Sequence, residues 1–107
     1  MNISTPLACN MGVFTPEQRQ AHILNTTQLI QTMRSIGEVE NGYEFTFPNE
    51  SEVIAKVAEF ITNERRCCPF LEFTLKVAAN DLPVTLSLTG PSGTQEFLRE
   101  EFSGAFE

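Results

Sequence analysis

Two stretches of this chain alternate apolar and polar side chains with a period of two, and this repeated pattern is what most constrains the fold. The first stretch covers residues 36–47, and the second covers residues 71–88. The dipeptides Asn41-Gly42 and Asn80-Asp81 favour turns, so each stretch is divided into two short strands. Each stretch is therefore predicted to form a β-hairpin with one apolar face.

The first hairpin allows two registers. A strict two-residue turn at Asn41-Gly42 would place Glu40 opposite Tyr43 on the apolar face. A three-residue loop with Gly42 in the left-handed conformation instead matches Val39 to Tyr43. We predict the three-residue loop.

A helix is predicted before the first hairpin. Thr15 and Gln18 form a capping box, and the helical period then continues over residues 16–35. The apolar arc of this helix includes Ile23, and His22 lies inside the same arc. We therefore expect His22, the only histidine of the chain, to face inward.

A last helix is predicted after Gly90-Pro91, with Ser92 and Gln95 as its capping pair. Together with the second helix described below, the order is helix, hairpin, helix, hairpin, helix, which contains two ββα units. We predict an α+β fold in which helices cover one face of a four-stranded antiparallel sheet. The composition is uniform over 107 residues, so we expect one domain, 1–107, with residues 1–14 as an N-terminal arm.

The second helix, predicted over residues 51–66, leads into an unusual pair of cysteines before Pro69. Projected at 100° per residue, Glu64, Cys67 and Cys68 fall within the apolar stripe of this helix. A carboxylate there loses solvation and also lies at the negative end of the helix dipole. We expect compensation from a neighbouring arginine at position 65 or 66, a bound cation or a proton.

Three cysteines in a short chain suggest a site for a soft ion. Cys67 and Cys68 supply two sulfurs, and Cys9 supplies a third if the N-terminal arm folds back. Three thiolates suit mercury, arsenite, cadmium or copper(I), and Glu64 or His22 would complete a four-ligand zinc site. We predict a small binding module whose metal residues are Cys9, Glu64, Cys67 and Cys68.

The charge and the cysteine count indicate which partners and which cellular location such a module would have. The chain has 14 acidic and 7 basic residues, a formal charge of −7 and no basic stripe, which disfavours nucleic-acid binding. Residues 1–14 lack a basic start followed by an apolar run, and no stretch is apolar enough to span a membrane. An odd cysteine count predicts free thiols in a cytoplasmic protein.

The motif around these cysteines resembles that of small uncharacterised bacterial proteins. It is also similar to the C-terminal extension of some MerR-family regulators of the heavy-metal type. The matching positions are Ala8-Cys9, Arg19, Gly42-Tyr43-x-Phe45, Glu64-x-x-Cys67-Cys68-Pro69-Phe70-x-x-Phe73-x-Leu75 and Gly90-Pro91. The resemblance implies metal or metalloid handling, with Cys9, Cys67 and Cys68 as the reactive positions and Glu64 beside them. The winged-helix segment of those regulators is missing, so a DNA-binding role is not implied.

Two other interpretations remain open. In the first, the protein is an enzyme with Cys67 or Cys68 as a nucleophile or redox thiol and Glu64 or His22 as its base. The chain has no CxxC motif and one histidine, so we predict no enzyme. In the second, the cysteines are small core residues of a structural protein that forms a homodimer, with Phe106 at a self-associating surface.

Overall fold

The computed structural model describes residues 7–106 and has the predicted α+β fold. Three α-helices alternate with two β-hairpins, and a short 3₁₀ helix lies near each end. The elements are η1 (Met11–Val13), α1 (Pro16–Thr32), β1 (Ser35–Val39), β2 (Gly42–Phe47), α2 (Ser51–Cys67), β3 (Glu72–Val77), β4 (Val84–Thr89), α3 (Thr94–Glu101) and η2 (Ser103–Phe106). The predicted order of helices and hairpins is confirmed.

The two hairpins join into one antiparallel sheet with strand order β1-β2-β4-β3. The contact between the hairpins is made by β2 and β4, whose apolar residues lie directly opposite one another. The facing pairs are Tyr43 with Leu88, Phe45 with Leu86 and Phe47 with Val84. All six side chains are buried, so the two alternating patterns form one continuous apolar face.

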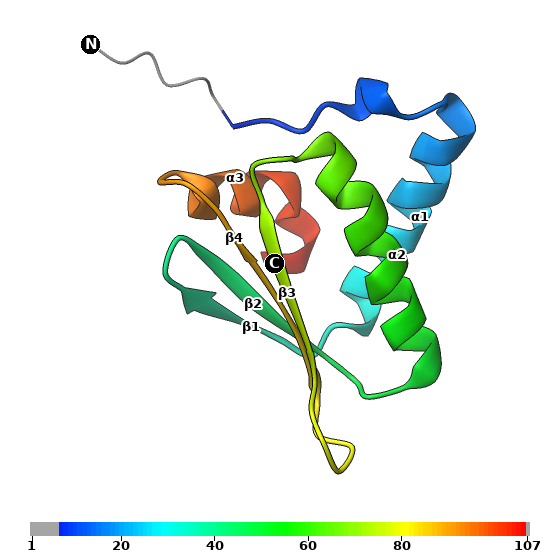
Figure 1. The fold of residues 1–107 in the computed structure, drawn as a ribbon, viewed down its shortest axis with the longest axis vertical. Coiled ribbons are helices and arrows are strands. Elements are labelled where there is room, and N and C mark those ends of the chain that lie inside the picture. The colour runs from blue at the N-terminus through cyan, green and yellow to red at the C-terminus, as the bar shows by residue number, and fades with distance from the viewer. Residues whose placement is uncertain (1–6, 107) are drawn as a thin grey trace.

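Helices cover this apolar face, as the sequence predicts (Figure 1). Helices α1 and α2 lie side by side, and the side chain of Asn25 donates a hydrogen bond of 3.0 Å to the Lys56 carbonyl between them. Leu29 of α1 and Phe60 of α2 reach the same apolar layer as Phe45 and Leu86 of the sheet. Burial of this layer is the main source of stability.

The predicted capping box is confirmed at the start of α1, whereas the predicted capping pair of α3 is wrong. Thr15 and Gln18 form both hydrogen bonds of the capping box at the start of α1. Helix α3 begins instead after Gly93, whose φ of 99° lies in the left-handed region, and no side chain caps it. The side chain of Gln95 donates to the carbonyls of Val39 and Gly42, so it links α3 to the first hairpin.

Helix α1 ends at Thr32, three residues earlier than predicted, and its inward face is more polar than expected. Ile23 is 51% exposed, so its predicted place in the core is wrong. His22 and Asn25 are buried on this helix together with Leu29. Contacts with α2 therefore decide which side of α1 faces inward.

The predicted loop of the first hairpin is also wrong. Val39 pairs with Gly42, and the loop consists of Glu40 and Asn41. Asn41, with φ 57°, adopts the left-handed conformation that was expected of Gly42. Gly42 is needed for a different reason, because a Cβ atom at this position would overlap the Leu88 carbonyl oxygen on β4.

We expect Gly42→Ala to lower the free energy of unfolding by about 1 to 3 kcal/mol, because β2 and β4 would have to separate locally. Chemical denaturation measures this change. Gly37→Ala on β1 is the matched control, since an added Cβ there meets no heavy atom within 4 Å. An equal loss in both variants would contradict this reason for the glycine.

The described part of the N-terminal arm, residues 7–14, packs against the end of α2, whereas we expected an arm without fixed structure. The amide of Asn10 donates to the Cys67 carbonyl at 2.8 Å, and the guanidinium of Arg66 donates to the Val13 carbonyl at 3.0 Å. Phe14 is buried beneath Arg66. These contacts hold Cys9 close to the cysteine pair.

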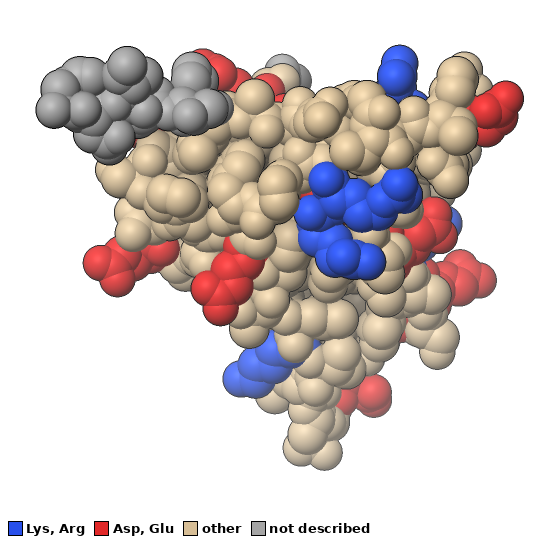
Figure 2. Space-filling model, turned by 45° about the horizontal axis from the view of Figure 1, so that its top comes forward, with Lys and Arg blue, Asp and Glu red and all other residues tan. Residues whose placement is uncertain are grey.

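Two expectations about the surface can be compared with the structure. Phe106 packs edge-on against Tyr43, with ring centroids 4.8 Å apart, so it covers the sheet of its own chain. Within residues 7–106, no helix is both long and apolar enough to cross a membrane. Figure 2 shows one larger group of basic side chains on the face drawn, with further basic side chains apart from it and acidic side chains at separate positions.

Candidate metal centre

The last turn of α2 presents a carboxylate and two thiols to the interior. Glu64, Cys67 and Cys68 follow one another at spacings of three and one residues, which places them on one side of the helix end. Glu64 is only 2% exposed, and both cysteines are fully buried. The prediction of a carboxylate inside the apolar stripe is therefore confirmed.

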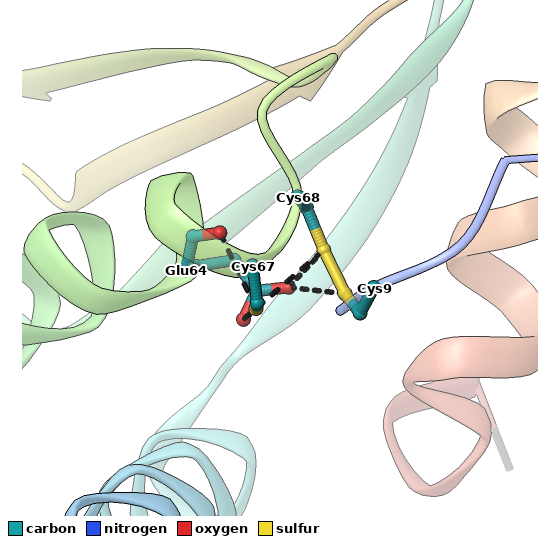
Figure 3. Close-up of side chains that lie close together, drawn as sticks. All are labelled: Cys9, Glu64, Cys67 and Cys68. Atoms are coloured by element: carbon teal, nitrogen blue, oxygen red, sulfur yellow. Dashed lines mark hydrogen bonds between the residues drawn. A yellow bond between two sulfur atoms is a disulfide. The ribbon is translucent and has the colours of Figure 1, made fainter. Parts of the chain in front are cut away.

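The N-terminal arm brings Cys9 to this helix end from 55 residues away (Figure 3). One ligand atom from each of Cys9, Glu64, Cys67 and Cys68 lies within 4.8 Å of the others. These are the four residues predicted to form the site, and they come from the arm, the last turn of α2 and its C-cap. The cluster has the composition and spacing to hold a metal ion.

Glu64 is the centre of this cluster, because sulfur atoms approach both of its carboxylate oxygens. Oε2 lies 3.2 Å from Cys68 Sγ and 3.6 Å from Cys9 Sγ. Oε1 lies 3.7 Å from Cys67 Sγ. The sulfurs of Cys67 and Cys68 are 3.8 Å apart.

Cys9 and Cys68 are joined by a disulfide, with their Cα atoms 4.7 Å apart. Cys67 is the remaining free cysteine, and it is buried. The expectation of three free thiols is therefore wrong for this form of the protein. It failed because a cysteine count cannot show that the arm brings Cys9 onto Cys68.

The free thiol of Cys67 is held in its protonated form. Burial, the charge of Glu64 and a hydrogen bond to Glu64 together raise the pKa of Cys67 from 9.0 to about 12. A thiol with such a pKa is a poor nucleophile at neutral pH. A metal ion that binds Cys67 has to displace this proton.

His22 contacts the buried carboxylate, whereas the arginines, one of the three predicted sources of compensation, do not. Nε2 of His22 lies 2.7 Å from Oε1 of Glu64, and both side chains are almost completely buried. Arg66 is exposed and directs its guanidinium to Val13 and Phe14. The sequence places both His22 and Glu64 inward, but their meeting depends on how α1 and α2 are aligned.

No protein-family model, curated protein or solved structure matches this chain. The geometry of the four-residue cluster therefore carries the functional argument.

A half-open cavity of about 220 Å³ borders the cluster on the side of Glu64 and His22. Glu101, at the end of α3, lies on the same cavity. Loss of solvation and the charge of Glu64 raise the pKa of Glu101. Sequence reasoning missed this neighbour, because only the packing of α3 brings Glu101 to the cavity. The cavity therefore lies directly beside the histidine–glutamate pair.

Proposed function

We propose that this protein is a small binding module that captures a soft metal or metalloid ion through the reduced thiols of Cys9, Cys67 and Cys68. Glu64 is the oxygen-bearing partner of the three sulfurs. The ion is mercury, arsenite, cadmium, copper(I) or zinc, all of which bind thiolates well. The observation that supports this proposal is the approach of four donor residues to within 4.8 Å of one another.

Burial strengthens the case for an ion. A buried carboxylate is unfavourable without a positive partner, and a cation bonded to several of these groups would provide one. Within residues 7–106, the basic side chain that contacts the Glu64 carboxylate is His22, through a hydrogen bond at its Nε2. The guanidinium groups nearest in sequence are exposed and do not reach the carboxylate.

The binding form is the reduced protein. A sulfur in the Cys9–Cys68 disulfide has no thiolate to offer, so this bond and a three-sulfur site exclude each other. Reduction of the disulfide frees the two thiols in place, because Asn10 still ties the arm to the Cys67 carbonyl. The proposal therefore applies to protein treated with a phosphine reductant under anaerobic conditions.

We expect reduced wild-type protein to bind one equivalent of cadmium or mercury, with thiolate-to-metal charge-transfer absorption. Cys9→Ser, Cys67→Ser and Cys68→Ser should each lower the affinity by roughly 100-fold, because each removes one of about four ligands. Titration followed by ultraviolet absorption measures both quantities. Arsenite binding is measured by competition with cadmium.

Glu59→Gln is the matched control for charge, since Glu59 lies exposed on the same helix as Glu64. This variant should bind the ions as the wild type does. Equal affinity for every ion in wild type and in all three serine variants would refute the proposed function.

A thiol–disulfide redox function is the second candidate, and the Cys9–Cys68 bond is the observation that favours it. In that case the pair would exchange with external dithiols without any need for an ion. A reduced protein that reacts rapidly with disulfides but binds none of these ions would support the redox function. The raised pKa of Cys67 argues against an enzyme that uses Cys67 as its nucleophile.

Location and partners follow from this proposal. A module that needs free thiols works best in a reducing compartment, which agrees with the predicted cytoplasmic location. The absence of nucleic-acid binding and the formation of a homodimer stay predictions. Salt-dependent binding assays and light scattering on the reduced protein would address them.

A further inference from the structure

Three of the spacings among the four donors match the edges of a tetrahedral site. An ion bonded tetrahedrally to thiolates at about 2.3 Å and to a carboxylate oxygen at about 2.0 Å needs S···S edges of about 3.8 Å and S···O edges of about 3.5 Å. Three edges agree with these values: 3.8 Å between Cys67 and Cys68, and 3.6 Å and 3.2 Å from Glu64 Oε2 to Cys9 and Cys68. Cys9 and Cys68 are joined by the disulfide, so their edge has to open on reduction. Glu64 thus lies at the distance of a fourth ligand.

His22 determines which oxygen of Glu64 is free for an ion. Its Nε2 lies 2.7 Å from Oε1, which leaves Oε2 directed to the sulfurs of Cys9 and Cys68. The imidazole packs between Phe14 and Phe60, with ring centroids 5.4 Å and 5.7 Å away. These contacts fix the ring, and the ring in turn fixes the carboxylate.

The hydrogen bonds of the imidazole indicate its proton arrangement. Nδ1 of His22 is buried and has no hydrogen-bond partner within residues 7–106. A bare nitrogen acceptor in such a place costs less than a buried N–H without an acceptor. The ring hydrogen is therefore assigned to Nε2, which donates to Oε1 of Glu64 and leaves Oε2 directed to the sulfurs.

We infer that Glu64 Oε2 is the fourth ligand of a tetrahedral site, that His22 is the residue that positions it, and that the site selects divalent ions such as zinc and cadmium over arsenite. This inference rests on the proposed function and deepens it. Three thiolates and one carboxylate carry the same charge as the four thiolates of a common zinc site. Trivalent arsenic needs only the three sulfurs and gains nothing from a fixed carboxylate.

Cobalt(II), cadmium and arsenite are the probes for this inference, used with reduced protein. We expect the cobalt(II) complex of the wild type to show the strong d–d bands of a tetrahedral ion. Glu64→Gln keeps the size of the side chain but removes its charge. It should lower cadmium and zinc affinity by roughly 10- to 100-fold, weaken the d–d bands and leave arsenite affinity unchanged.

Variants of His22 test the positioning role through the same readouts. His22→Phe keeps an aromatic ring between Phe14 and Phe60 but removes the donor, and it should lower cadmium affinity by roughly 10-fold. His22→Gln restores a donor and should recover part of the loss. Glu59→Gln should leave cadmium, zinc and arsenite affinity at the wild-type level. If His22→Phe fails to fold by circular dichroism, Glu64→Gln and His22→Gln decide the question.

The two proposals fail in different ways. Ion binding that depends on the cysteines, but with equal cadmium affinity in wild type and Glu64→Gln, would overturn the inference alone. Tighter binding of arsenite than of cadmium by the wild type would also overturn it. Absence of cysteine-dependent binding of every ion would refute the proposed function itself.

Discussion

We expect oxidation of Cys9 and Cys68 to the disulfide to lower the cadmium affinity of the protein by roughly 10,000-fold. A structural zinc ion contributes about 10 to 16 kcal/mol through four ligands, so each ligand carries roughly 3 kcal/mol, or about 100-fold in affinity. The disulfide removes two of the three sulfurs and leaves only Cys67. With hydrogen peroxide as oxidant, two thiols and one peroxide give one disulfide and two water molecules, so bound ion is released.

The measurement is a cadmium titration of one protein sample in three states. The sample is reduced, then oxidised, then reduced again, and mass spectrometry confirms the disulfide at the second stage. Affinity should be high, low and high again. Cadmium affinity that stays constant through the cycle would show that Cys9 and Cys68 are not ligands.

We expect Cys67 in the disulfide form to react with iodoacetamide about 1,000-fold more slowly at pH 8 than a thiol with an unshifted pKa. The rise of its pKa from 9.0 to about 12 reduces the thiolate fraction by that factor. Burial and the negative charge of Glu64 are the causes, so unfolding should abolish the protection. The reaction rate should keep rising with pH well beyond pH 9.

The same pKa shift predicts how stability depends on pH. Because the folded state raises the pKa of Cys67, it favours the neutral thiol. This contribution to stability is fully present below pH 9 and is lost as the pH rises from 9 towards 12. The free energy of unfolding should therefore fall over this range, and it should fall less in Cys67→Ala.

The slow reaction of Cys67 is tested by alkylating the oxidised protein across pH 7 to 11 and following the product by mass spectrometry. The control is the same protein unfolded in urea without reductant, in which the pKa of Cys67 should return to its unshifted value of 9.0. A midpoint near this value in the folded protein would contradict the raised pKa. Slow alkylation alone would not decide the matter, because burial also limits access.

The fold was predictable from the sequence because its signals are local. The period-two alternation on β2 and β4 and the capping box at Thr15 depend on residues that are near neighbours in the chain. Register was not predictable to the same degree. Gly42 was predicted to be a turn residue. A glycine is needed there because the Leu88 carbonyl of the other hairpin comes so close that it leaves no room for a side chain.

In the candidate site, too, the features set by local spacing were predictable and those set by tertiary packing were not. Helical spacing alone placed Glu64, Cys67 and Cys68 on one side of the chain, since three and four residues make about one helical turn. The predicted sources of compensation were an arginine at position 65 or 66, a bound cation or a proton, and His22 was not among them. Exposed side chains next to Glu64 in sequence point away from it, whereas His22, 42 residues earlier, reaches its carboxylate.

The sequence by itself determined the order of helices and hairpins and the presence of a carboxylate among thiols at the end of α2. Hydrogen bonding and side-chain direction within one element depend on a few consecutive residues, so these features can be read locally. Only the tertiary structure decided that Cys9 meets Cys68 and that His22 holds Glu64. Those contacts depend on how the arm and two helices pack together, which no single segment specifies.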